Sequence, residues 1–221
     1  MVIIYNMYDP DNANLLEYKL KGMTNSMLWD YNGELLTAEV TNAPYNEIAA
    51  TSFETNSGTG SWSGINPTNI VDDINSVTGE RHYNESGFAI YKSSLLSSTT
   101  YIVSYWTKNS LPFSVPGTQA GYPKKSRTIS INGELWTCFE HLVSGLTMVA
   151  IMGSGTIDDL RLYPMHAQMI TYTYMPLVGI TSLCDINNKV TYYKYDNSGR
   201  LKLIRDQEGN IIKKYDYKYQ Q

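Results

Sequence analysis

The sequence is poor in charged residues and contains no long hydrophobic run. Charged residues make up 17% of the chain, below the roughly 25% typical of soluble domains. The net charge of −4 offers no positive field for nucleic acid. No stretch of about 18 apolar residues is present, so no transmembrane helix is expected. The opening residues, MVIIYNMYDP, lack the basic region and long apolar core of a signal peptide. We therefore expect no nucleic-acid partner, no membrane span and no signal peptide in this chain.

Residues that carry catalytic chemistry are also scarce. Cys138 and Cys184 are too few for a disulfide framework, and we expect two buried free thiols, although the sequence leaves open whether they pair. His82, His141 and His166 lie in unrelated contexts. The sequence contains no Gly-x-Ser-x-Gly, His-Glu-x-x-His or Cys-x-x-Cys motif. We predict that the chain is not an enzyme and assign no catalytic residue.

Turn-forming and β-forming residues fill the place of the missing charges, which favours an all-β fold. Thr, Ser, Asn, Gly and Tyr are abundant, and no window shows sustained helical periodicity. Tyrosine is unevenly distributed: residues 1–45 and 165–221 hold five and eight of the 19 tyrosines. This distribution separates the two ends of the chain from its middle.

The two ends share a strand–turn–strand pattern. Residues Met27–Val40 place Asn32-Gly33 between alternating apolar runs, a strong hairpin signal. Residues Thr191–Tyr219 read as three strands joined by turns at Asn197-Ser198-Gly199 and Glu208-Gly209-Asn210. We interpret the ends as one repeat array, residues 1–48 and 165–221, interrupted by an insertion of residues 49–164. The two end segments are predicted to pair in one small sheet.

The middle segment has the short strands and Gly/Pro/Asn turns of a β-sandwich. In the strand YIVSYWT, side-chain alternation places Tyr105 on one face and Trp106 on the other. One of these aromatic rings must therefore point away from the sandwich core. This arrangement suits a binding face, and it equally suits packing against the repeat array.

Two family resemblances follow from these motifs. The order Tyr-Asp, Gly-Arg-Leu, Asp-x-x-Gly-Asn-Ile near the C-terminus resembles the YD repeats of bacterial RHS/YD-repeat surface and toxin-delivery proteins. An opening Phe-Glu strand, a strand like YIVSYWTK, a Trp-led strand like ELWTCFEH and a closing IDDLRLYP resemble carbohydrate-binding, galactose-binding-like jelly rolls. The first resemblance implies a segment of a larger exported polypeptide at the bacterial surface or outside the cell. The second, over about half the chain, implies an inserted jelly roll.

The jelly-roll resemblance implies a structural calcium ion near the first and last strands of the sandwich. Its ligands would be Glu54 and Asp158, with Asp159 as the alternate. Carboxylate oxygens suit this hard cation, which takes six to eight oxygen ligands. The alternative is that Asp158 and Asp159 only cap or solvate a strand end.

Sugars stack on aromatic rings, and Trp62, Tyr91 and Trp106 are the candidate glycan-binding residues. Core or inter-domain packing is the alternative for each of them. We expect a non-catalytic segment of an RHS/YD-repeat protein with glycan binding through the jelly roll. One alternative is a structural spacer without a ligand. The other is a glycan-active enzyme, for which Glu134 and Glu140 are the available carboxylates but nothing fixes their separation.

Overall fold

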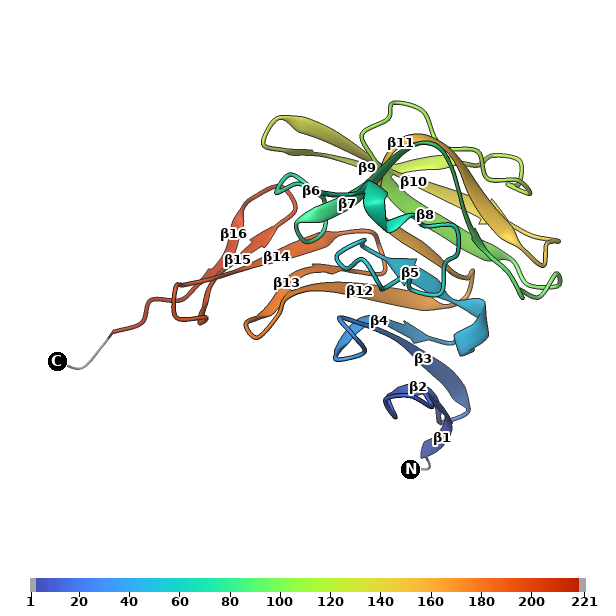
Figure 1. Cartoon of the computed structure of the whole chain (residues 1–221), viewed down its shortest axis with the longest axis horizontal. Helices are drawn as coiled ribbons and strands as arrows, with labels where there is room; N and C mark the ends of the chain where they lie inside the picture. The colour runs from blue at the N-terminus through green and yellow to red at the C-terminus, as the bar shows by residue number, and fades with distance from the viewer. Residues whose placement is uncertain (1–2, 219–221) are drawn as a thin grey trace.

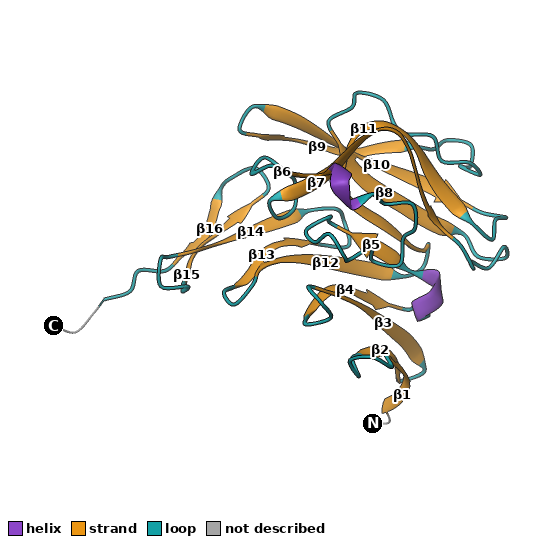
Figure 2. Ribbon diagram, in the orientation of Figure 1, coloured by secondary structure: helices purple, strands orange, loops and turns teal. Residues whose placement is uncertain are grey.

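The structure, a computed structural model, describes residues 3–218. This part of the chain forms two antiparallel sheets and contains no α-helix, so the predicted all-β fold is confirmed (Figures 1 and 2). Its only helical segments are two short 3₁₀ turns, η1 (Tyr45–Glu47) and η2 (Pro67–Asn69). Neither is long or apolar enough to cross a membrane.

The first sheet has nine strands in the order β1-β2-β3-β4-β12-β13-β14-β15-β16 and is called the outer sheet here. The N-terminal strands join the C-terminal strands where β4 pairs with β12, with Met169 opposite Val40. The predicted pairing of the N- and C-terminal segments is confirmed, in a larger sheet than expected. Its strands are β1 (Ile3–Tyr8), β2 (Leu15–Leu20), β3 (Met23–Asp30), β4 (Leu35–Thr41), β12 (Gln168–Met175), β13 (Gly179–Cys184), β14 (Val190–Tyr195), β15 (Leu201–Asp206) and β16 (Ile211–Lys214).

The second sheet contains seven strands and folds into the sandwich. Residues 149–157 of β11 pair with β7, whereas residues 158–164 pair with β8. Strand β11 is therefore shared by the two layers of the sandwich. The strands are β5 (Ala49–Thr51), β6 (Ile70–Asp72), β7 (Arg81–Lys92), β8 (Tyr101–Thr107), β9 (Lys124–Ile131), β10 (Glu134–Val143) and β11 (Val149–Pro164). All of them come from the predicted insertion. Whether that segment folds by itself as a domain stays a prediction.

The turns between outer strands form for the reasons expected from the sequence. Asn32 and Gly33 have φ values of 61° and 81° in the β3–β4 turn, the left-handed region that Asn and Gly tolerate best. In the β14–β15 turn, the Asp196 carboxylate accepts hydrogen bonds from the N–H groups of Ser198 (2.9 Å) and Arg200 (3.0 Å). The Asp of the Tyr-Asp pair is thus a turn cap. Tyr219, the last residue of the predicted repeat segment, lies outside the described residues.

One face of the sandwich packs against the outer sheet, which gives three layers (Figure 1). Strand β8 lies in the middle layer, and the side chains on its two faces pack into different hydrophobic cores. Tyr101 and Tyr105 pack into the sandwich core, whereas Trp106 packs with Cys184 and Val190 of the outer sheet. The predicted alternation of Tyr105 and Trp106 is confirmed, and the second aromatic ring packs against the outer sheet.

Candidate functional site

The two best calcium candidates, Glu54 and Asp158, face the same short loop between β6 and β7. Asp158 is fully buried, and its carboxylate accepts hydrogen bonds from the N–H (2.8 Å) and the hydroxyl (3.0 Å) of Thr78. The Glu54 carboxylate accepts the N–H groups of Glu80 (3.1 Å) and Arg81 (3.0 Å). The structure therefore brings together two carboxylates that lie about a hundred residues apart in the sequence.

Gly79 allows the loop to approach Glu54 closely. Its φ is +63°, and a β-carbon at this position would overlap the Glu54 carboxyl group. A side chain would therefore be strained by the backbone conformation and would also displace the carboxylate.

Burial makes ionisation of this carboxyl pair unfavourable. It raises the pKa of Glu54 to about 8, against the lowering effect of the Glu80 and Arg81 N–H groups. Burial also raises the pKa of Asp158 well above its usual range, and the charges of Asp159 and Glu54 add to this rise. A cation beside the pair would favour the ionised forms.

Asp159 has different partners from those of the Glu54–Asp158 pair. One oxygen accepts the hydroxyl of Thr171 (2.8 Å), and the other lies 3.4 Å from Nε of Arg161. No group of three His, Cys, Asp or Glu side chains suited to a metal ion occurs within residues 3–218. The donor set therefore fits calcium only in part: Glu54 and Asp158 could contribute carboxylate oxygens, and the rest of a shell of six to eight would have to come from other groups.

The candidate glycan-binding aromatics differ in exposure. Trp62 is 2% exposed and Trp106 is fully buried. Trp62 packs in the sandwich core, and Trp106 packs between the middle layer and the outer sheet. These two indoles offer no free face to a sugar, which corrects their assignment as stacking residues. Tyr91 on β7 is 38% exposed and remains available.

A buried ionic and thiol cluster in the middle layer was missed by sequence reasoning. Arg161 is fully buried; its Nε lies 3.3 Å from the Ser104 hydroxyl, and its Nη1 donates to the Asp185 carbonyl (3.1 Å). Cys138 and Cys184 pack in the same region as free, buried thiols, as expected. Burial raises the pKa of Cys138 to about 12, so it is an inert thiol at neutral pH. The signal was Arg161 placed between Leu160 and Leu162, directly after Asp158 and Asp159 in the same strand.

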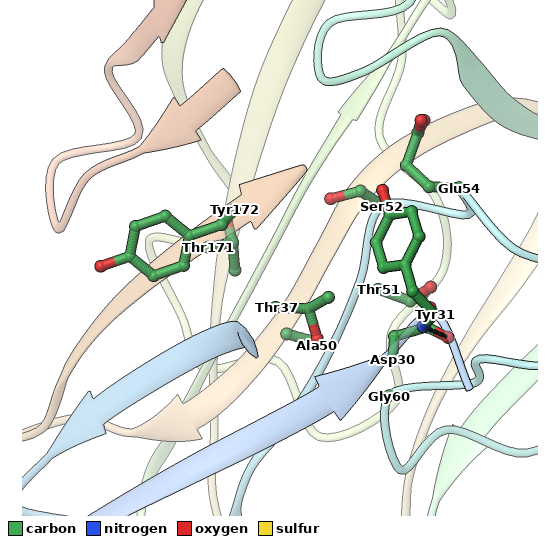
Figure 3. Close-up of a pocket in the computed structure, with 10 residues that line it drawn as sticks. All are labelled: Asp30, Tyr31, Thr37, Ala50, Thr51, Ser52, Glu54, Gly60, Thr171 and Tyr172. Carbon is green, nitrogen blue, oxygen red and sulfur yellow. Dashed lines mark hydrogen bonds between the residues drawn. The ribbon is translucent and has the colours of Figure 1, made fainter. Parts of the chain in front are cut away.

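Two cavities adjoin Glu54 at the junction of the sandwich and the outer sheet. The smaller, of about 10 Å³, is drawn in Figure 3, with Tyr31 and Glu54 on one side and Thr171 and Tyr172 on the other. That volume is about enough for a single water molecule. The larger is an open cleft of about 530 Å³, called the inter-sheet cleft here. Its lining residues are Tyr31, Glu54, Thr55, Asp72, Asp73, Ile74, Glu80, Arg81, Tyr174, Met175, Pro176 and Thr181.

Comparisons with known proteins assign no family. The sequence matches no protein-family model, and no curated protein is similar enough to count as a relative. The function is therefore argued from the layers and from the sites between them.

Proposed function

We propose that this chain is a non-catalytic structural segment of a larger RHS/YD-repeat protein, located at the bacterial surface or outside the cell. In this role the sandwich covers one face of a repeat sheet and stiffens it. The observation that carries the proposal is the middle layer, in which β8 contributes side chains to the sandwich core and to the interface with the outer sheet.

The turns of the outer sheet support the repeat assignment. The Asp206 carboxylate accepts the N–H of Asn210 (2.8 Å), and Gly209 has a φ of +85°. Asp196 and Gly199 play equivalent parts in the preceding turn, where Gly199 has a φ of +73°. The same Asp and Gly positions thus produce the same turn twice in succession, as expected of a repeat unit.

Cooperative unfolding tests the structural role. If the layers form one rigid segment, hydrogen exchange in rising urea should show β8 and β13 opening together. Val190→Ala, in the interface with the middle layer, should lower the urea concentration at which β8 and β13 open. Val71→Ala is the matched control, because Val71 is 39% exposed on β6. Separate midpoints, or an effect of Val190→Ala confined to the outer sheet, would contradict the proposal.

Glycan binding by the sandwich is the second candidate function. It is supported by the half-exposed ring of Tyr91 on β7, since sugars stack on such rings. A glycan array followed by affinity electrophoresis should show retention that Tyr91→Ala abolishes and Tyr5→Ala, a control on the outer sheet, preserves. If no glycan retains the protein, glycan binding is ruled out and only the structural role stands.

A structural calcium ion held partly by Glu54 and Asp158 is also proposed, because both carboxyl groups lie against the same β6–β7 loop. Added calcium should raise the melting temperature, because a ligand that binds only the folded state stabilises it. Glu54→Gln should remove most of this rise. An unchanged melting temperature with calcium and with a chelator would exclude the ion.

A further inference from the structure

The inter-sheet cleft is a site that the structural role leaves unused. Its volume of about 530 Å³ lies within the roughly 300–1,000 Å³ of small-molecule pockets. Residues of the sandwich form one wall, and the β3–β4 and β12–β13 turns of the outer sheet form the other. A ligand bound here would contact both layers.

The outer-sheet wall is aromatic and apolar. The rings of Tyr31 and Tyr174 meet edge to face, with centroids 5.8 Å apart. The Tyr31 hydroxyl accepts the N–H of Tyr174 (3.0 Å) and donates to its carbonyl (3.2 Å), which fixes the pair. Met175, 44% exposed, lies beside these rings at the next position of the chain. This wall suits an aliphatic chain or the apolar face of a sugar ring.

The sandwich wall is acidic. Arg81 pairs with Asp72 (2.8 Å), and Asp73 pairs with Lys108 (2.9 Å). Glu54 and Glu80 form no salt bridge within residues 3–218, and the Glu80 side chain accepts no hydrogen bond there. Lys108 is shared between Asp73 and Glu134. Carboxyl groups thus outnumber cationic groups on this wall. The wall therefore opposes an anion and favours a cation.

We propose that the inter-sheet cleft binds a ligand carrying an ammonium group on a partly apolar or sugar-like frame. The ammonium group lies near Glu80, and the frame lies against Tyr31 and Tyr174. Amino sugars, lysine side chains and polyamines share this chemistry. The proposal is independent of the structural role, because the layers would pack in the same way with the cleft empty.

The decisive experiment compares two sugars that differ in their charge. Deacetylated chitobiose carries ammonium groups, whereas N,N′-diacetylchitobiose has a similar sugar frame with neutral amides. Titration calorimetry should detect binding of deacetylated chitobiose and no binding of N,N′-diacetylchitobiose. Raising the salt concentration tenfold should weaken binding severalfold, because exposed charges are screened. Nα-acetyl-lysine methylamide and 1,5-diaminopentane, titrated in parallel, would distinguish a peptide or polyamine source from an amino sugar.

Two matched substitutions locate the site. Glu80→Gln should weaken binding about two- to fivefold, as expected for an exposed charge pair. Glu34→Gln removes the same charge from an exposed residue that does not line the cleft and should leave affinity unchanged. Equal binding of the two sugars, equal effects of the two substitutions, or no binding of any probe at 10 mM (about the weak limit for a specific site) would overturn the proposal.

Discussion

Strands β8 and β1 are built from similar residues but occupy opposite environments. Strand β8, YIVSYWT, is almost wholly buried on both faces and pairs with β10 and β11. Strand β1, IIYNMY, is exposed on both faces and, within the described part of the chain, pairs only with β2. Tyrosine and branched aliphatic residues favour strands in either place. Position in the layers decides whether the same residues form a core or a solvent-exposed edge.

The largest expected loss of stability comes from a cavity in the interface between β8 and the outer sheet. Trp106→Ala should destabilise the protein by about 3–5 kcal/mol, because a fully buried indole is replaced by a cavity. Tyr5→Ala on β1, where the ring is 57% exposed, should change stability by less than about 1 kcal/mol. Urea denaturation followed by circular dichroism measures both. Similar losses would remove the distinction between the two strands.

Breaking the buried ion pair should have the next largest effect. Arg161→Met leaves Asp159 without its cation and should cost about 3 kcal/mol. Arg200→Met, in the partly exposed pair with Asp196, should cost less than about 1 kcal/mol. The double variant Asp159→Asn/Arg161→Met should recover part of the loss. A double variant no more stable than Arg161→Met would show that charge is not the cause.

The pH dependence of stability should differ between the buried carboxyls and those at the outer sheet. Glu54 has its pKa raised from 4.5 to about 8, so the folded state binds more protons than the unfolded state between these values. Stability should therefore fall as pH rises from about 5 to 8, by at most about 1.4 kcal/mol per pH unit for this group.

The contribution of Asp206, at the β15–β16 turn, to stability changes with pH in the opposite direction. Hydrogen bonds from Asn210 lower the pKa of its carboxyl, so its contribution is present above the unfolded pKa and is lost on acidification. Glu54→Gln should flatten the fall in stability between pH 5 and 8. An unchanged slope in Glu54→Gln would show that this group does not cause it.

The smallest change in stability is expected at the free edge. Ile4 is 54% exposed on β1, and Ile4→Lys should change the free energy of unfolding by less than about 0.5 kcal/mol. Exposed apolar edge strands promote association between sheets, and lysine opposes it. Analytical ultracentrifugation should therefore show less self-association in the variant. A large loss of stability would mean that β1 is better packed than its exposure indicates.

Local sequence patterns predicted much of the fold. Asn32-Gly33 identified the β3–β4 hairpin, and strand alternation placed Tyr105 and Trp106 on opposite faces. The likeness of the two ends predicted that they pair. These features depend on neighbours within a few residues, or on a repeated pattern, and both can be read directly from the chain.

The candidate sites were harder to predict. The sequence singled out Glu54 and Asp158 through a family resemblance, but it could not show that the Thr78–Arg81 loop supplies their hydrogen-bond donors. It offered Trp62 and Trp106 as candidate glycan-binding residues, with core or inter-domain packing as the alternative, and both are buried. Exposure depends on which surfaces meet, and that involves residues far apart in the chain.

The sequence by itself determined that this protein is all-β, where its turns fall and which side chains share a strand face, because side-chain alternation and turn geometry are local. Only the tertiary structure decided that the outer sheet covers the sandwich, that Arg161 is buried with Asp159, and that Tyr174 and Glu80 face one cleft. Those outcomes follow from packing between layers, where the burial of one surface depends on the shape and chemistry of the other.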